Sequence, residues 1–103
     1  MAEPVAAAHH LDQLAAALRE AGWGTRRRHG QGTELLQVFS TDLPGVGESI
    51  RVGTGIGGLP CFISSTGDPM AHCHDLHGAR MEVAIRLSRL GISVDLQQRP
   101  QTA

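Results

Sequence analysis

The stretch from Asp68 to Leu90, DPMAHCHDLHGARMEVAIRLSRL, decides how the chain folds. Asp68 suits an N-cap, because its carboxylate can accept hydrogen bonds from the free N–H groups of a first helical turn. Pro69 then takes the first helical position, where its missing N–H costs nothing. Apolar residues recur at three- and four-residue steps, namely Leu76, Ala79, Val83, Leu87 and Leu90. The pattern predicts a long helix that begins at Pro69 and ends at Gly91.

The residues before this stretch predict one more helix and several short strands. Leu11, Leu14, Ala15 and Leu18 repeat at helical spacing, which indicates a helix over residues 9–21. Alternating and β-branched segments between turn residues predict strands at 25–29, 34–40, 49–53 and 60–64, and after the long helix at 92–96. The segment 42–47 is predicted to be a loop.

This order, α-β-β-β-β-α-β, indicates a single α+β domain over residues 9–97, between a flexible N-terminus (1–8) and a flexible tail (98–103). Short loops join antiparallel neighbours, so we expect a four- or five-stranded, mainly antiparallel meander. The two amphipathic helices should cover one face of that sheet. The core is expected to contain Leu14, Leu18, Leu36, Val38, Ile50, Val52, Val83 and Leu87.

Composition limits the classes of function. The formal net charge is -1, so no overall field selects nucleic acid or an anionic membrane. No apolar run approaches the ~20 residues of a membrane span, and the N-terminus lacks a signal-peptide pattern. A cytoplasmic location with reduced cysteines is therefore expected. All nine basic residues are arginine, a bias that suggests a GC-rich bacterial genome.

Two short motifs carry a resemblance. Gly22-Trp23 follows the first predicted helix, and Ser65-Thr66-Gly67 leads into the last one. In these motifs the chain resembles small uncharacterised actinobacterial α+β proteins, and in element order it resembles type III secretion chaperone-like proteins. The resemblance implies a binding protein that could form a dimer, and it assigns no active-site residue.

The cluster His72-Cys73-His74-x-x-His77 is a candidate metal site, because imidazole nitrogen and thiolate sulfur are the usual zinc ligands. On a continuous helix Cys73 and His77 would share one side, and His74 lies three residues from His77. Cys61, His29 or another chain would have to complete the coordination. The spacing matches no standard zinc motif, and a buried, unreactive Cys73 is the simpler interpretation. Catalysis by Cys73 is less favoured still.

Arg26 and Arg28 alternate along the first predicted strand and, with Arg51, could share the open face of the sheet. Such a face could bind carboxylate or phosphate groups of a partner. The alternative is a solvated face paired with Glu34 or Glu48. Nucleic-acid binding is disfavoured, because the chain has only three aromatic residues to stack on bases.

The sequence is therefore interpreted as a non-catalytic protein-binding or regulatory module without a cofactor. Its alternatives are a metal-binding domain and a small nucleic-acid-associated protein. A protein partner or a second copy of the chain is expected, since an edge strand at Ile92 to Leu96 would invite pairing into a homodimer.

Overall fold

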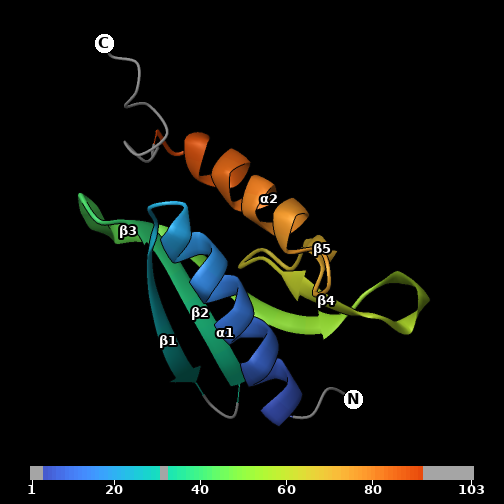
Figure 1. Cartoon of the computed structure of the whole chain (residues 1–103). Coiled ribbons are helices and arrows are strands. Elements are labelled where there is room, and N and C mark those ends of the chain that lie inside the picture. The colour runs from blue at the N-terminus through green and yellow to red at the C-terminus, as the bar shows by residue number, and fades with distance from the viewer. Residues whose placement is uncertain (1–3, 31–32, 92–103) are drawn as a thin grey trace.

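The computed structural model describes residues 4–30 and 33–91, and within them it places two helices against an open sheet (Figure 1). The elements in chain order are α1 (Pro4–Glu20), β1 (Gly24–Gly30), β2 (Thr33–Ser40), β3 (Leu43–Thr54), the 3-10 turn η1 (Ile56–Gly58), β4 (Pro60–Ile63), β5 (Pro69–His72) and α2 (Leu76–Ser88).

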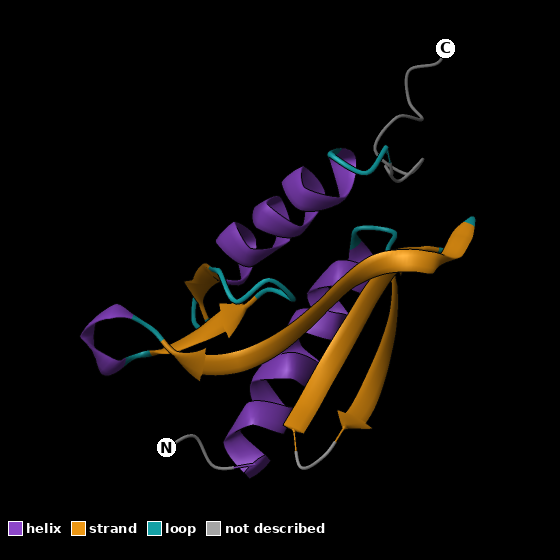
Figure 2. Ribbon diagram, turned by 180° about the vertical axis from the view of Figure 1, so that it is seen from behind, coloured by secondary structure: helices purple, strands orange, loops and turns teal. Residues whose placement is uncertain are grey.

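The five strands of the described residues form one sheet in the order β1-β2-β3-β4-β5, and each neighbouring pair is antiparallel. Both helices lie on the same face, in front of the sheet in Figure 1 and behind it in Figure 2. The predicted α+β meander is confirmed. Its order is α-β-β-β-β-β-α, because five strands precede the last helix. The strand predicted at 92–96 lies outside the described residues.

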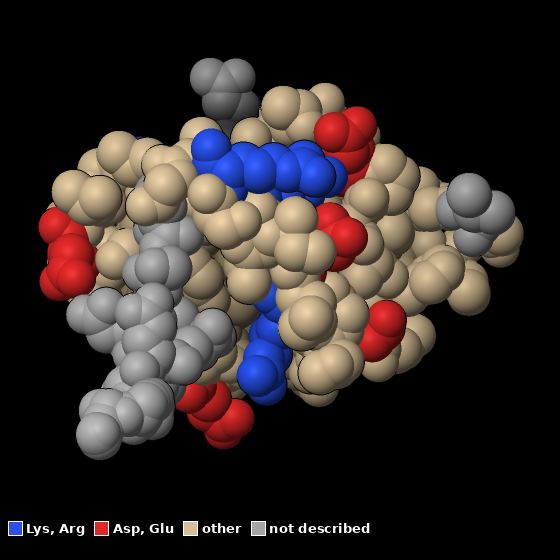
Figure 3. Space-filling model, turned by 90° about the horizontal axis from the view of Figure 1, so that it is seen from above, with Lys and Arg blue, Asp and Glu red and all other residues tan. Residues whose placement is uncertain are grey.

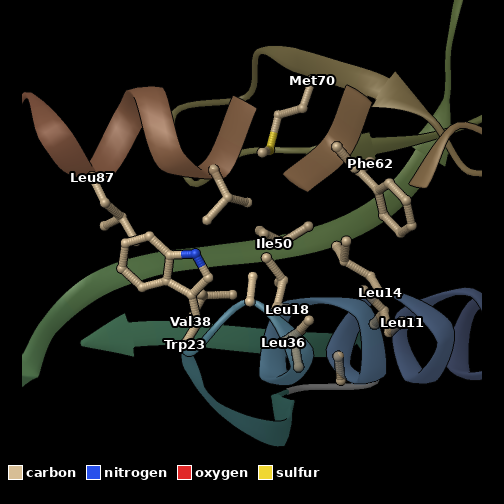
Figure 4. Packing of buried hydrophobic residues seen from close by; sticks show 14 of the residues in the cluster. Leu11, Leu14, Leu18, Trp23, Leu36, Val38, Ile50, Phe62, Met70 and Leu87 are labelled. Carbon is tan, nitrogen blue, oxygen red and sulfur yellow. The ribbon is translucent and has the colours of Figure 1, made fainter. Parts of the chain in front are cut away.

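Helix α1 begins at Pro4, earlier than predicted from its leucines, and proline suits that first helical position. Leu11, Leu14 and Leu18 are fully buried and point from α1 toward the sheet (Figure 4). Trp23 follows the helix and is also buried. The apolar stripe that the sequence showed is therefore the face that attaches α1 to the sheet.

The prediction of a helix from Pro69 with Asp68 as its N-cap is wrong. Residues Pro69–His72 form β5, which pairs with β4, and Met70 is buried in the core. Proline is tolerated at the start of an edge strand, where a missing N–H removes no ladder hydrogen bond. Pairing with β4 therefore overrides the local helix signals of this segment.

Helix α2 begins at Leu76 instead, and Asp75 is its N-cap. The Asp75 carboxylate accepts a hydrogen bond from the Gly78 N–H at 2.9 Å, and the Ala79 N–H donates to the Asp75 carbonyl oxygen at 3.0 Å. Asp75 thus satisfies two backbone N–H groups of the first turn. The motif matches the predicted cap in kind but lies seven residues later in the chain.

Strand β3 is longer than predicted, because the segment 43–47 belongs to it and is not a separate loop. Ser40 pairs with Leu43, and Phe39 pairs with Gly47, so residues 44–46 bulge out of the ladder. A Cβ at Gly47 would overlap the Val38 carbonyl oxygen. Glycine at this position lets the two backbones approach each other closely. From the sequence alone, the same glycine counts as a turn residue and predicts a loop.

The core lies between the helices and the sheet (Figure 4). Seven of the eight predicted core residues belong to the buried cluster, and Val52 packs against it. Leu90, the last residue of the predicted apolar stripe, does not belong to the cluster. It lies beyond the end of α2 and is 55% exposed. The apolar stripe therefore ends at Leu87.

Candidate functional site: the outer face of the sheet

Arg26 and Arg28 of β1 point away from the helices. Arg27 between them lies on the helix side, because it donates to the Ala8 carbonyl oxygen at 3.3 Å and also to the Asp12 carboxylate. Side chains alternate along a strand, so Arg26 and Arg28 occupy the opposite, outer face, and both are exposed.

Arg51 lies on the same outer face. It follows Ile50, which is fully buried on the helix side of β3 and pairs with Leu36 of β2. By alternation Arg51 therefore points outward, and it is exposed. The structure thus brings the three predicted arginines to one face of the sheet.

Polar and aromatic groups lie between the arginines. Arg26 pairs with Gln37, which pairs in turn with Ser49, so these three residues cross the sheet in one row. The Arg26 guanidinium carbon lies 5.2 Å from the centre of the Phe39 ring, a cation–π distance. A side chain at Gly24 would overlap that ring.

Arg28 begins a second row. It pairs with Leu35 of β2, and its guanidinium donates to the Gln37 side-chain oxygen at 3.5 Å. Arg51 lies one strand further on, about 10 Å from Arg28 at the usual strand spacing. We call the set Arg26, Arg28, Gln37, Ser49 and Arg51 the arginine face.

The two carboxylates of these strands lie on the other face. Glu34 binds Arg27 and contacts His29 at 2.6 Å. Glu48 pairs with the core residue Val38 and accepts hydrogen bonds from the Ser65 backbone and hydroxyl at 2.7 and 2.8 Å. The alternative in which Glu34 or Glu48 pairs with the outer arginines is therefore not what the structure shows.

Within the described residues, no ion pair involves the three outer arginines. In the view of Figure 3, at one end of the molecule, arginine and acidic side chains lie next to one another, so this surface carries mixed charge and not a patch of one sign. The arginine face differs because β1, β2 and β3 place no carboxylate on it. Its excess of positive charge is local.

The His and Cys residues of the metal alternative are not brought together. Cys73 lies before α2, so it does not share a helix face with His77, and the spacing argument for this pair is wrong. Cys73 is buried, whereas His72, His74 and His77 are exposed. The described residues contain no group of three or more His, Cys, Asp or Glu side chains that could hold a metal ion.

The two thiols occupy different places. Cys61 pairs with His72, and the Cys73 N–H donates to the Pro60 carbonyl oxygen at 3.0 Å, so alternation puts the cysteines on opposite faces of the ladder. Burial, and after it the nearby Cys61, raise the pKa of Cys73 to about 11. A thiol with this pKa is protonated at neutral pH and is a poor nucleophile.

One contact escaped the sequence analysis. The His10 ring on α1 meets the His74 ring edge-on, with centroids 5.8 Å apart, and the His10 Nδ1 atom is buried without a hydrogen-bond partner among the described residues. Burial, then His74 and His9, lower the pKa of His10. The two residues are far apart in the sequence and share no motif. The outer positions of Gln37 and Ser49, in contrast, could have been found by alternation.

Comparison of the chain with protein-family models, with curated proteins and with solved structures found no match. In the part of the chain that the structure describes, no helix is long and apolar enough to cross a membrane. The function must therefore be argued from the residues of the chain itself.

Proposed function

We propose that the protein is a non-catalytic binding module that holds an acidic segment of a partner protein on the arginine face. One observation carries the proposal: three exposed arginines share a sheet face on which the same strands place no carboxylate. An anionic partner would supply the missing opposite charge. The proposal includes the bacterial, chaperone-like, cytoplasmic character expected from the sequence.

The chemistry of this face favours carboxylates. Guanidinium groups form charge-assisted, often bidentate hydrogen bonds with carboxylates, and these are stronger than neutral ones. Gln37 and Ser49 add donors within the row that Arg26 begins. Phe39 is half-buried beneath Arg26 and is the sole Phe, Tyr or Trp side chain of β1, β2 and β3, whereas His29 lies on the helix side. A face with one aromatic residue offers little stacking for nucleic-acid bases.

The test compares two triple variants of equal charge. Arg26, Arg28 and Arg51 are changed to Ser in the first, and Arg19, Arg80 and Arg89, which lie on or just after the helices, are changed to Ser in the second. Binding of a fluorescein-labelled glutamate-rich peptide is followed by anisotropy at low salt. We expect the first variant to lose binding and the second to retain most of it.

Stability and DNA binding complete the test. The free energy of unfolding of the first variant should lie within about 1 kcal/mol of that of the parent, because exposed charges contribute little to folding. Equal peptide binding by the parent and the first variant would refute the proposal. Salt-sensitive binding to random-sequence DNA, lost in the same variant and without any peptide binding, would favour the nucleic-acid alternative.

A further inference from the structure

Strand β1 is an edge of the sheet. Among the described strands it pairs with β2 alone, over seven residues, and it lies at the border of the sheet in Figure 2. Among the described residues, no backbone group of β1 has a backbone partner outside this pairing. An edge strand presents a row of unpaired N–H and C=O groups, which can template the addition of another strand.

The charges of β1 decide which strand can be added. Among the described residues Arg26 and Arg28 form no ion pair on the outer face, whereas Arg27 pairs on the helix side with Asp12 and Glu34. A second copy of β1 would place arginines beside arginines, and like charges on paired strands are destabilising. The edge therefore disfavours pairing with itself and favours a strand with carboxylates on the outer face.

We infer that β1 accepts an added strand from its partner, with acidic residues at alternate positions beside Arg26 and Arg28. The inference rests on the proposed function and narrows its contacts to Arg26 and Arg28, at the β1 end of the arginine face. Main-chain hydrogen bonds to the β1 edge would supply affinity, and the carboxylates would select the partner. Side chains directly opposite on neighbouring strands have Cβ atoms about 5 Å apart, within reach of ion pairs between Glu and Arg.

Whether binding needs Arg51 distinguishes an added strand from a ligand that lies across the outer face. An added strand lies three strand spacings from β3, about 15 Å, which is too far for its carboxylates to contact Arg51. Strand addition therefore requires Arg26 and Arg28 but not Arg51. A segment that crosses the outer face would use all three arginines.

The experiment uses the full chain and a labelled ten-residue peptide of alternating Glu and Thr. Two further versions of the peptide are methylated on the odd or on the even backbone amides. Only one set of amides can face β1, whichever way the peptide runs, because successive N–H groups of a strand point to opposite edges. We expect one methylated peptide to bind about tenfold more weakly and the other to bind like the parent peptide.

Protein variants give the second arm. Arg26→Ser with Arg28→Ser should weaken binding of the parent peptide by about tenfold or more, and Arg51→Ser should change it by less than about twofold. A Lys-Thr peptide should not bind. Far-UV circular dichroism and urea unfolding confirm that each variant is folded.

The outcomes separate the two claims. If both methylated peptides bind like the parent and Arg51→Ser weakens binding as much as the double variant, the strand-addition mode is refuted while the proposed function stands. If the acidic peptides do not bind, or bind without need of any arginine, both claims fail.

Discussion

At the scale of single residues, Gly47 is the position where one methyl group has the largest expected effect. A Cβ there would overlap the Val38 carbonyl oxygen, a backbone atom that cannot move aside, whereas a Cβ at Gly45 meets nothing within 4 Å. We expect Gly47→Ala to lower the free energy of unfolding by about 1–3 kcal/mol, and Gly45→Ala to change it by less than about 0.5 kcal/mol. Urea denaturation measures both, and equal losses would contradict the bulge.

A second residue-scale prediction concerns the start of α2. Asp75→Ala removes the N-cap and should cost about 0.5–2 kcal/mol of stability. Asp68→Ala is its control, because among the described residues the exposed Asp68 carboxylate bonds to Thr66 alone and lies 3.8 Å from Arg86. That variant should cost less than about 0.5 kcal/mol, as expected for an exposed ion pair. A larger loss at Asp68 would show that the helix begins near Pro69.

His10 gives the expected pH dependence. Its pKa in the folded protein lies below the ordinary value of 6.5, so the unfolded chain binds protons first as the pH falls. The stability that neutral His10 contributes is complete above pH 6.5 and is lost as the pH falls from there to the lower pKa of the folded state.

The measurement is the free energy of unfolding between about pH 7.5 and about pH 5.5. The parent should become less stable toward acid, and His10→Gln should show a smaller decline. His77→Gln, at an exposed position, should keep the decline of the parent. Identical curves for the parent and His10→Gln would show that protonation of His10 does not affect folding.

At the scale of elements, the loss of stability when a leucine in or just after α2 is changed to alanine depends on whether that leucine is buried. Leu87 is fully buried, and Leu90 is 55% exposed. Leu87→Ala should lower stability by about 2–5 kcal/mol, because it removes a packed side chain and leaves a cavity. Leu90→Ala should change it by less than about 0.5 kcal/mol. The reverse order, seen by urea denaturation, would mean that α2 buries a different face.

Periodicity explains which elements could be predicted. The leucines of α1 and the alternation around Ile50 indicated both the elements and their buried faces, since those patterns depend on local geometry alone. The segment 69–72 was misassigned because Asp-Pro is a good helix start in isolation, and its pairing with β4 is a tertiary effect. The prediction of a loop over residues 42–47 failed for the same reason, because the pairing of Gly47 with Phe39 is also a tertiary effect.

The candidate site follows the same division. Period-two alternation puts Arg26 and Arg28 on one face of their strand and Arg51 opposite Ile50, but that all three share the outer face depends on the register of β1, β2 and β3. The helix-side positions of Glu34 and Glu48 follow from alternation, because each lies two residues before a predicted core residue, Leu36 and Ile50 respectively. The contact between His10 and His74 depends on how α1 lies beside the turn before α2, and no local pattern encodes it.

At the scale of the whole molecule, the described sheet is open and has two edges. β5 has four residues and begins with Pro69, and β1 carries three arginines. Short strands, proline and charge are the usual protections of an edge against self-pairing. A homodimer would therefore have to form through another surface, and the strand predicted from the sequence at Ile92 to Leu96 lies outside the described residues.

The homodimer is tested on the full chain by light scattering. If residues 92–96 pair with a second copy, the measured mass should be twice 10.9 kDa. Val94→Pro should then give the monomer mass, because proline removes a ladder N–H and is excluded from a paired strand. Gln98→Pro, beyond the predicted strand, should remain dimeric. A parent that has the monomer mass at high concentration would exclude the homodimer, and a Val94→Pro variant that stays dimeric would assign the interface to another surface.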